Sequence, residues 1–162
     1  MDQNKNRIDI YTDGGCSGNP GPGGWGYVIL CNEKIYKNSG CDKETTNNKM
    51  ELLAVIKALE AYKKSFAGKV SGSQEDQGVR VFTDSAYVKN GITSWIKTWL
   101  KNGWKTADKK DVKNKELWVA LKNLSDQIKT EWVWVKGHSG NKWNEECDAL
   151  VKKEINAANK KT

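Results

Sequence analysis

Four acidic residues stand where they could hold divalent metal ions. Asp13 and Asp84 each follow an apolar run and a threonine, in the segments IYTDGG and VFTDSA. Glu51 and Asp148 lie in two segments of helical periodicity, at the border of an apolar stripe. Carboxylates are the ligands that magnesium and manganese prefer, and a pair of such ions can hydrolyse a phosphodiester. The set therefore indicates metal-assisted hydrolysis of a phosphodiester.

Each acid taken alone also has a simpler structural interpretation. An aspartate after a strand commonly caps a helix or turns the chain. Asn48 and Glu51 have the spacing of a capping box. Asp148, taken alone, is most simply a solvent-exposed acid on a helix. The repeated context of Asp13 and Asp84 favours metal binding, because like charges brought together usually share a proton or a cation.

The elements that must position these acids follow from hydrophobic periodicity. Segments rich in β-branched and aromatic residues predict strands at 7–12, 25–31, 34–39, 79–83 and 131–135. Helical spacing predicts helices at 49–64 and 143–157, and an interrupted helical region over 85–128. The glycine-rich segment that follows Asp13 predicts a loop without regular structure.

This order of elements predicts an α/β fold with a mixed five-stranded sheet. Short connections make the first three strands antiparallel, and the helical crossover makes the fourth parallel to a neighbour. Asp13 and Asp84 each stand at the carboxyl end of a strand, where α/β sheets bind ligands, and they would lie close together if these two strands are neighbours. We expect one domain over 1–162, with a flexible surface loop at 66–78 and a C-terminal tail at 158–162.

Positive charge is concentrated in one part of the chain. The net charge is +7, and residues 89–122 hold nine lysines and three acids, which gives six of these charges. Such an excess attracts polyanions, nucleic acid above all, although a solvated lysine-rich face is the simpler interpretation of any single lysine. The segment is therefore a candidate nucleic-acid contact.

Other features limit the classes of protein. No apolar run approaches the ~18 residues of a membrane span, and the N-terminus lacks the apolar stretch of a signal peptide. The sequence therefore predicts a cytoplasmic protein without membrane contact. The cysteines form no C-x-x-C pair and His138 is the one histidine, so a structural zinc site is not expected and the thiols should be free.

The ordered motifs resemble those of bacterial type 1 ribonucleases H. They are YTDGGCSGNPGPGGWG, TTNNKMELLAVIKALE, FTDSAYVKNGI, GWKTADKKDVKN and WVKGHSGNKWNEECDAL, and they cover about 7–151. The resemblance implies a ribonuclease H-like fold: three antiparallel strands plus two parallel ones, flanked by helices, with a basic helical protrusion at about 92–115. It also implies a monomeric enzyme that hydrolyses the RNA strand of RNA–DNA hybrids.

The resemblance assigns roles to individual residues. It makes Asp13, Glu51, Asp84 and Asp148 the catalytic carboxylates, holding two Mg²⁺ ions with substrate bound, and Mn²⁺ as a substitute. His138 matches the catalytic loop histidine that assists proton transfer or product release. The matching substrate-binding positions are Asn19, Thr46, Asn47, Asn48, Trp95 and Asn144.

Some positions leave alternatives open. The family commonly carries glutamine after TDS, where this chain has Ala86, so one minor-groove hydrogen bond is expected to be missing. For Trp95 and its aromatic neighbours, core packing is the simpler interpretation. The alternatives to a stand-alone enzyme are the ribonuclease H domain of a reverse transcriptase and a non-catalytic hybrid-binding module. The complete carboxylate set, the compact length and the basic segment favour the stand-alone enzyme.

Overall fold

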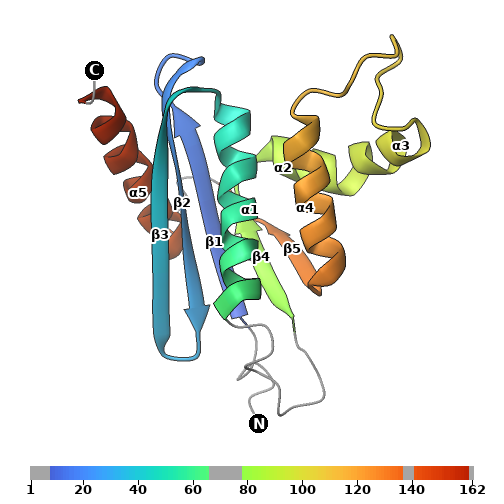
Figure 1. Cartoon of the computed structure of the whole chain (residues 1–162). Helices are drawn as coiled ribbons and strands as arrows, with labels where there is room; N and C mark the ends of the chain where they lie inside the picture. The colour runs from blue at the N-terminus through green and yellow to red at the C-terminus, as the bar shows by residue number, and fades with distance from the viewer. Residues whose placement is uncertain (1–7, 66–77, 137–140, 161–162) are drawn as a thin grey trace.

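A mixed sheet forms the centre of the molecule (Figure 1). The computed structural model describes residues 8–65, 78–136 and 141–160. The sheet has five strands in the order β3-β2-β1-β4-β5. Their bounds are β1 Ile8–Cys16, β2 Gly21–Cys31, β3 Lys34–Thr45, β4 Val79–Thr83 and β5 Thr130–Trp134.

The strand pairing agrees with the prediction. β2 runs antiparallel to both β1 and β3, whereas β4 runs parallel to β1 and to β5. The crossover that joins β3 to β4 contains α1, and α4 leads into β5. The helical elements are α1 Asn47–Ser65, α2 Ala86–Asn90, the π-helix η1 Gly91–Trp95, α3 Ile96–Lys101, α4 Lys115–Gln127 and α5 Lys142–Asn159.

Helices cover both faces of the sheet (Figure 1). α1 and α4 pack on one face, where Ile8, Ile10 and Leu59 belong to the main core. α5 packs on the other face, where Tyr11, Val28 and Cys147 form a smaller buried cluster. Because side chains alternate along a strand, Asp13 lies on the same face of β1 as Tyr11 and therefore faces the α5 side.

The glycine-rich segment is more regular than the sequence predicted. β1 continues through Gly14 and Gly15 to Cys16, and β2 already begins at Gly21. The predicted loop is therefore confined to the few residues between these strands. The glycines pair in the antiparallel register, Gly14 with Trp25 and Gly15 with Gly24, because the missing side chains make room for helices on both faces.

Several element ends also differ from the prediction. β3 extends to Thr45, well past the predicted end at residue 39. α5 continues to Asn159 because Ala158 is buried, so the predicted tail begins two residues later. The predicted surface loop lies, apart from Gly78, outside the described residues. Within those residues no helix is both long enough and apolar enough to cross a lipid bilayer.

The lysine-rich segment projects from the body of the molecule. The chain between α3 and α4 extends away from the sheet at the end where α1 begins (Figure 1). A bridge between Lys105 and Asp111 closes this segment on itself, and the buried side chain of Val112 anchors it to the domain. The structure thus contains the predicted helical protrusion.

Candidate active site

Asp13 and Asp84 occupy equivalent positions on neighbouring parallel strands. Tyr11 of β1 pairs with Phe82 of β4, and their rings stack with centroids 4.4 Å apart. Asp13 and Asp84 each stand two residues further along, on the face of these rings. The two strands are therefore neighbours, which is the condition for the two carboxylates to lie at one edge of the sheet.

The pKa of Asp13 reflects the other acidic residues near it. Burial raises the pKa of the Asp13 carboxyl to about 8, and repulsion from Asp84, Asp148 and Glu51 acts in the same direction. The backbone N–H of Gly14 opposes the shift only in part. The other three acids singled out from the sequence thus lie near enough to act on Asp13, although the four come from β1, α1, the end of β4 and α5.

Glu51 does not cap its helix. α1 begins at Asn47, and the hydroxyl of Thr46 accepts a hydrogen bond from the Lys49 N–H at 3.2 Å. Thr46 is therefore the capping residue, and Glu51 lies beyond the first turn, so the capping-box interpretation is wrong. The Glu51 carboxylate instead accepts a hydrogen bond from the Ser85 hydroxyl. Burial raises the pKa of Glu51, and the Ser85 hydrogen bond partly opposes this rise.

Gly14 sets the distance between β1 and α1 at this point. A Cβ atom on Gly14 would lie 2.3 Å from the carbonyl carbon of Met50 and 2.6 Å from the backbone nitrogen of Glu51. Any larger residue would push the helix away from the strand. The glycine after Asp13 is thus what allows Glu51 to stand beside the strand end that carries Asp13.

A similar close approach places Asp148. A Cβ atom on Gly26 of β2 would lie 2.9 Å from Cβ of Leu150 on α5, so the helix rests directly on the strand. The helix begins at a cap in which Asn141 Oδ1 accepts hydrogen bonds from the N–H groups of Trp143 and Asn144, both at 3.0 Å. Asp148 pairs with Lys152 at 3.0 Å on the same helix.

The four carboxylates fit hard divalent cations by their chemistry. Mg²⁺ and Mn²⁺ prefer oxygen ligands, and either ion would neutralise the excess negative charge at this half-buried edge. Among the described residues, no three acidic, histidine or cysteine side chains lie close enough to form a finished ligand group. Among these acids, Glu51 accepts a hydrogen bond from Ser85, and Asp148 pairs with Lys152.

The raised pKa of Asp13 predicts a pH-dependent stability in the metal-free protein. Between about pH 4 and pH 8 the unfolded chain loses the Asp13 proton while the folded chain keeps it, so stability falls as pH rises. Asp13→Asn should therefore be more stable than wild type at pH 8.5, by about 1 kcal/mol or more, which is about 2–4 °C in unfolding temperature.

This difference is measured by thermal unfolding in chelator at pH 5 and pH 8.5. The gain should be smaller at pH 5, where wild-type Asp13 keeps its proton. Asp108→Asn, at an exposed site in the protrusion, is the charge-matched control. An Asp13→Asn variant that is no more stable at pH 8.5, or gains equally at both pH values, would contradict the assignment.

The polar residues predicted to bind substrate gather where α1 begins. Asn19 Oδ1 accepts from the Asn47 N–H at 3.1 Å, and Asn47 Oδ1 accepts from the Cys16 N–H at 2.8 Å. Thr46 and the exposed Asn48 belong to the same turn. Because the amide oxygens are used internally, the amide nitrogens are the atoms that remain to donate to a ligand.

Two other predicted substrate residues lie deeper. The ring of Trp95 packs against those of Tyr87, Trp99 and Trp118, with centroids 5.5, 5.9 and 6.4 Å away, as the core interpretation expects. Asn144 is only 4% exposed, in the first turn of α5. Ala86 is the exposed first residue of α2. His138 lies outside the described residues.

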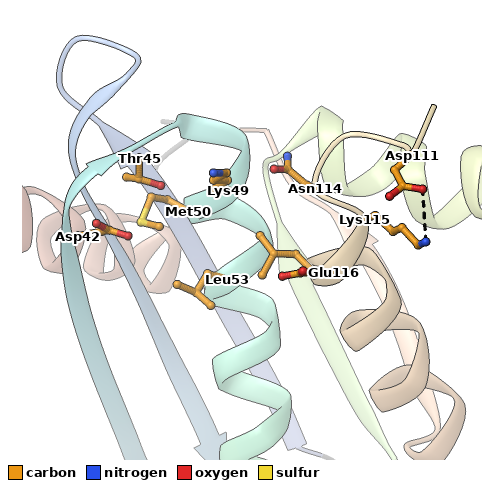
Figure 2. Close-up of a pocket in the computed structure, with 10 residues that line it drawn as sticks. Asp42, Thr45, Lys49, Met50, Leu53, Asp111, Asn114, Lys115 and Glu116 are labelled. Carbon is orange, nitrogen blue, oxygen red and sulfur yellow. Dashed lines mark hydrogen bonds and ion pairs between the residues drawn. The ribbon is translucent and has the colours of Figure 1, made fainter. Parts of the chain in front are cut away.

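A groove between α1 and the start of α4 contains residues that were not predicted to have a role (Figure 2). Its volume is about 610 Å³. Lys49 and Asn114 face each other across its upper part, and Asp42 and Glu116 lie lower down. Both Lys49 and Asn114 stand inside the motifs quoted above, and this was the hint in the sequence that they could be functional. Their proximity, however, depends on the packing of α4 beside α1.

The protrusion presents lysines without acidic partners. Lys105 and Lys115 both pair with Asp111, at 2.5 and 3.5 Å. Within the described part of the chain, no ion pair is formed by the exposed residues Lys97, Lys101, Lys109, Lys110 and Lys113. These side chains are free to meet a polyanion at the end of the molecule where α1 begins (Figure 1).

Similar sequences identify the family of this chain. A family model described as RNase H matches residues 5–156. A Treponema denticola protein named Ribonuclease H is 53% identical over 150 residues, which cover 89% of this chain and 94% of that protein.

Two solved structures extend the comparison. LC9-RNase H1, described as a type 1 RNase H with the type 2 active-site motif, matches with a TM-score of 0.76 and 29% identity, over 100% of this chain and 76% of that one. LC11-RNase H1 in complex with RNA/DNA hybrid matches with a TM-score of 0.69 and 29% identity, over 93% and 98%. The mixed sheet and its flanking helices therefore have the arrangement found in RNase H structures.

Proposed function

Because this chain belongs to the ribonuclease H family, we propose that it hydrolyses the RNA strand of RNA–DNA hybrids. The observation that most supports the proposal is that Asp84, Asp148 and Glu51 all act to raise the pKa of Asp13. Asp13, Glu51, Asp84 and Asp148 would hold two Mg²⁺ ions when substrate is bound, with Mn²⁺ as a substitute. We infer a monomeric, cytoplasmic enzyme.

The bound ions would supply an activated water and stabilise the charge that develops on the leaving oxygen, which gives 5′-phosphate and 3′-hydroxyl ends. The chain's own part is to hold the acids. Gly14 and Gly26 bring α1 and α5 against the sheet, and Ser85 holds the Glu51 carboxylate. His138 would move a proton near the leaving group, a task that suits a side chain with a pKa near neutrality.

Recognition of the RNA strand would fall to the polar turn at the start of α1. A 2′-hydroxyl, which both donates and accepts, is the group that distinguishes RNA from DNA. The amides of Asn19, Asn47 and Asn48 offer donors to such groups, and Asn144 would contribute after a small movement. Trp95 would contact the DNA strand only through the exposed part of its ring.

The DNA strand would pass over the groove beside α1. Lys49 and Asn114 face each other there and can both donate to a phosphate (Figure 2). The acids of the lower groove, Asp42 and Glu116, would keep a second phosphate out. The next phosphates would reach the unpaired lysines of the protrusion, which lies at the same end of the molecule.

The protrusion lysines predict a defined salt dependence. Removing Lys109 and Lys110 together should weaken hybrid binding and lower the slope of log affinity against log salt by about 1 per lysine. The measurement is fluorescence anisotropy of a labelled hybrid from low to moderate salt. The control removes Lys153 and Lys160 of the α5 region, on the opposite side of the sheet, and should leave the slope nearly unchanged.

The substrate class is tested by a panel of labelled nucleic acids. RNA–DNA hybrid, single-stranded RNA and duplex RNA are incubated with the protein in Mg²⁺ or in chelator. We expect cleavage of the hybrid alone, and only with Mg²⁺. Equal cleavage of all three substrates, or cleavage that survives chelation, would contradict the proposal. Tight hybrid binding without cleavage would identify a non-catalytic module instead.

A further inference from the structure

We propose that Ser85 is a positioning residue that holds the Glu51 carboxylate for metal binding and ties it to the helix that leads into the basic protrusion. The inference rests on the proposed function, because it assumes that Glu51 is a metal ligand. It assigns Ser85 a second role, distinct from its role at the start of α2.

Three hydrogen bonds fix the backbone and the hydroxyl oxygen of Ser85. Its N–H donates to Thr83 Oγ1 at 3.1 Å, and its carbonyl accepts from the Lys89 N–H at 3.0 Å. Its hydroxyl oxygen accepts from the Val88 N–H at 3.1 Å, which makes Ser85 the N-cap of α2. Ser85 is 3% exposed, so water has little access to compete for these atoms.

The hydroxyl proton is the part of Ser85 that capping does not use. A serine cap only needs to accept a hydrogen bond from the backbone. With Val88 occupying one lone pair, the single O–H donor points to Glu51 Oε2. The bond joins residues on two elements, α1 and the turn after β4, and is therefore additional to local helix chemistry.

The hydrogen bond removes freedom that Glu51 would otherwise have. A glutamate side chain that is released gains rotamer entropy, which must be lost again when it binds an ion. A carboxylate already held by Ser85 through Oε2 keeps that oxygen in place and leaves Oε1 available as a ligand for an ion. Groups that orient metal ligands in this way typically change metal affinity by about 10–100-fold when they are removed.

Ser85 also connects the site to the protrusion. Ser85 caps α2, and η1 and α3 follow α2 without a break to Lys101. Gly91, at the start of η1, lies so close to Trp118 that a Cβ would come within 2.0 Å of its ring. This fixed contact limits how α2 can turn, so the orientation of the Ser85 hydroxyl is set by the same packing that directs the protrusion.

The test measures metal binding without substrate. Free Mn²⁺ is followed by electron paramagnetic resonance during titration of the whole protein and of Ser85→Ala, Ser85→Gly and Ser85→Thr. Glycine is almost as good a cap as serine and alanine is poor, whereas neither can donate to Glu51. Threonine retains the hydroxyl. Unfolding temperatures of all variants are recorded alongside.

We expect the alanine and glycine variants to lose Mn²⁺ affinity equally, by about 10–100-fold, and threonine to restore it. The unfolding temperature should instead fall more for alanine than for glycine. If Mn²⁺ affinity follows stability, or is unchanged in the glycine variant, Ser85 is only a cap and the inference fails. If wild type binds no Mn²⁺, or Asp13→Asn binds it equally well, the metal site fails and the inference with it.

Discussion

Replacing Asp13 with asparagine is expected to lower the single-turnover rate of hybrid cleavage by about 10³-fold or more. Asparagine keeps the size of the side chain but lacks the charge that would hold a divalent ion. Metal stabilisation of the developing charge is worth several kcal/mol, and each 1.36 kcal/mol is a factor of about ten. Hybrid affinity should change little, because the lysines and amides that would contact substrate are untouched.

The matched control for this variant is Asp9→Asn. Asp9 lies on the same strand and, by alternation, on the same face as Asp13, but it pairs with Arg80 at 2.8 Å, away from the other site acids. The Asp9→Asn variant should cleave hybrid at close to the wild-type rate, with at most a loss of stability. Cleavage that persists in Asp13→Asn, or is lost equally in Asp9→Asn, would show that Asp13 has no special role.

The second large effect is expected from Gly14→Ala. The added Cβ would sit 2.3 Å from the backbone of Met50, so α1 must move away from β1 and take Glu51 with it. Overpacking of this kind costs about 1–3 kcal/mol of stability. Displacement of a metal ligand by an ångström should cost about 10²-fold in rate. Thermal unfolding and single-turnover cleavage measure the two effects separately.

Gly15→Ala provides an unusually close comparison. A Cβ on Gly15 would meet its nearest neighbours, Asn47 Oδ1 and Val151 Cγ1, at 3.7 and 3.8 Å, which is ordinary contact. The two variants thus differ only in which side of the strand receives the methyl group. A Gly15→Ala protein as impaired as Gly14→Ala would mean that the strand tolerates no side chain there, and that Gly14 does not specifically position α1.

Local patterns in the sequence were sufficient to predict the strands and their directions around the acids. The helical crossover predicted that the strand before Asp84 would run parallel to a neighbour, and the structure shows that this neighbour is the strand that bears Asp13. The short turns likewise predicted the antiparallel meander. These features depend on residues close in sequence and on the few topologies that right-handed crossovers permit.

Tertiary packing accounts for what the sequence could not predict. Glycines after Asp13 suggest a loop by local propensity, but here they lie within strands because α1 and α5 approach them closely. Asn48 and Glu51 have capping-box spacing, yet Thr46 caps the helix earlier and leaves Glu51 to Ser85. Such outcomes depend on contacts between distant segments, which no local pattern encodes.

The groove beside α1 and the hydrogen bond from Ser85 to Glu51 likewise could not be predicted from local sequence patterns. Lys49 and Asn114 stand far apart in the chain, and only the packing of α4 beside α1 brings them face to face. Ser85 has the sequence signature of a helix cap, which it is. Its donation to Glu51 could be recognised only once the distance between α1 and the end of β4 was known.

The most direct test of the central claim is an analysis of the ends left by cleavage. A hybrid labelled on both strands is mixed with the protein, and Mg²⁺ is added last. If carboxylate-held ions activate water, the RNA strand alone should be cut, only after Mg²⁺ addition, with 5′-phosphate and 3′-hydroxyl ends. A 2′,3′-cyclic phosphate end, which reports attack by the RNA's own 2′-hydroxyl, or a cut in the DNA strand would contradict the account.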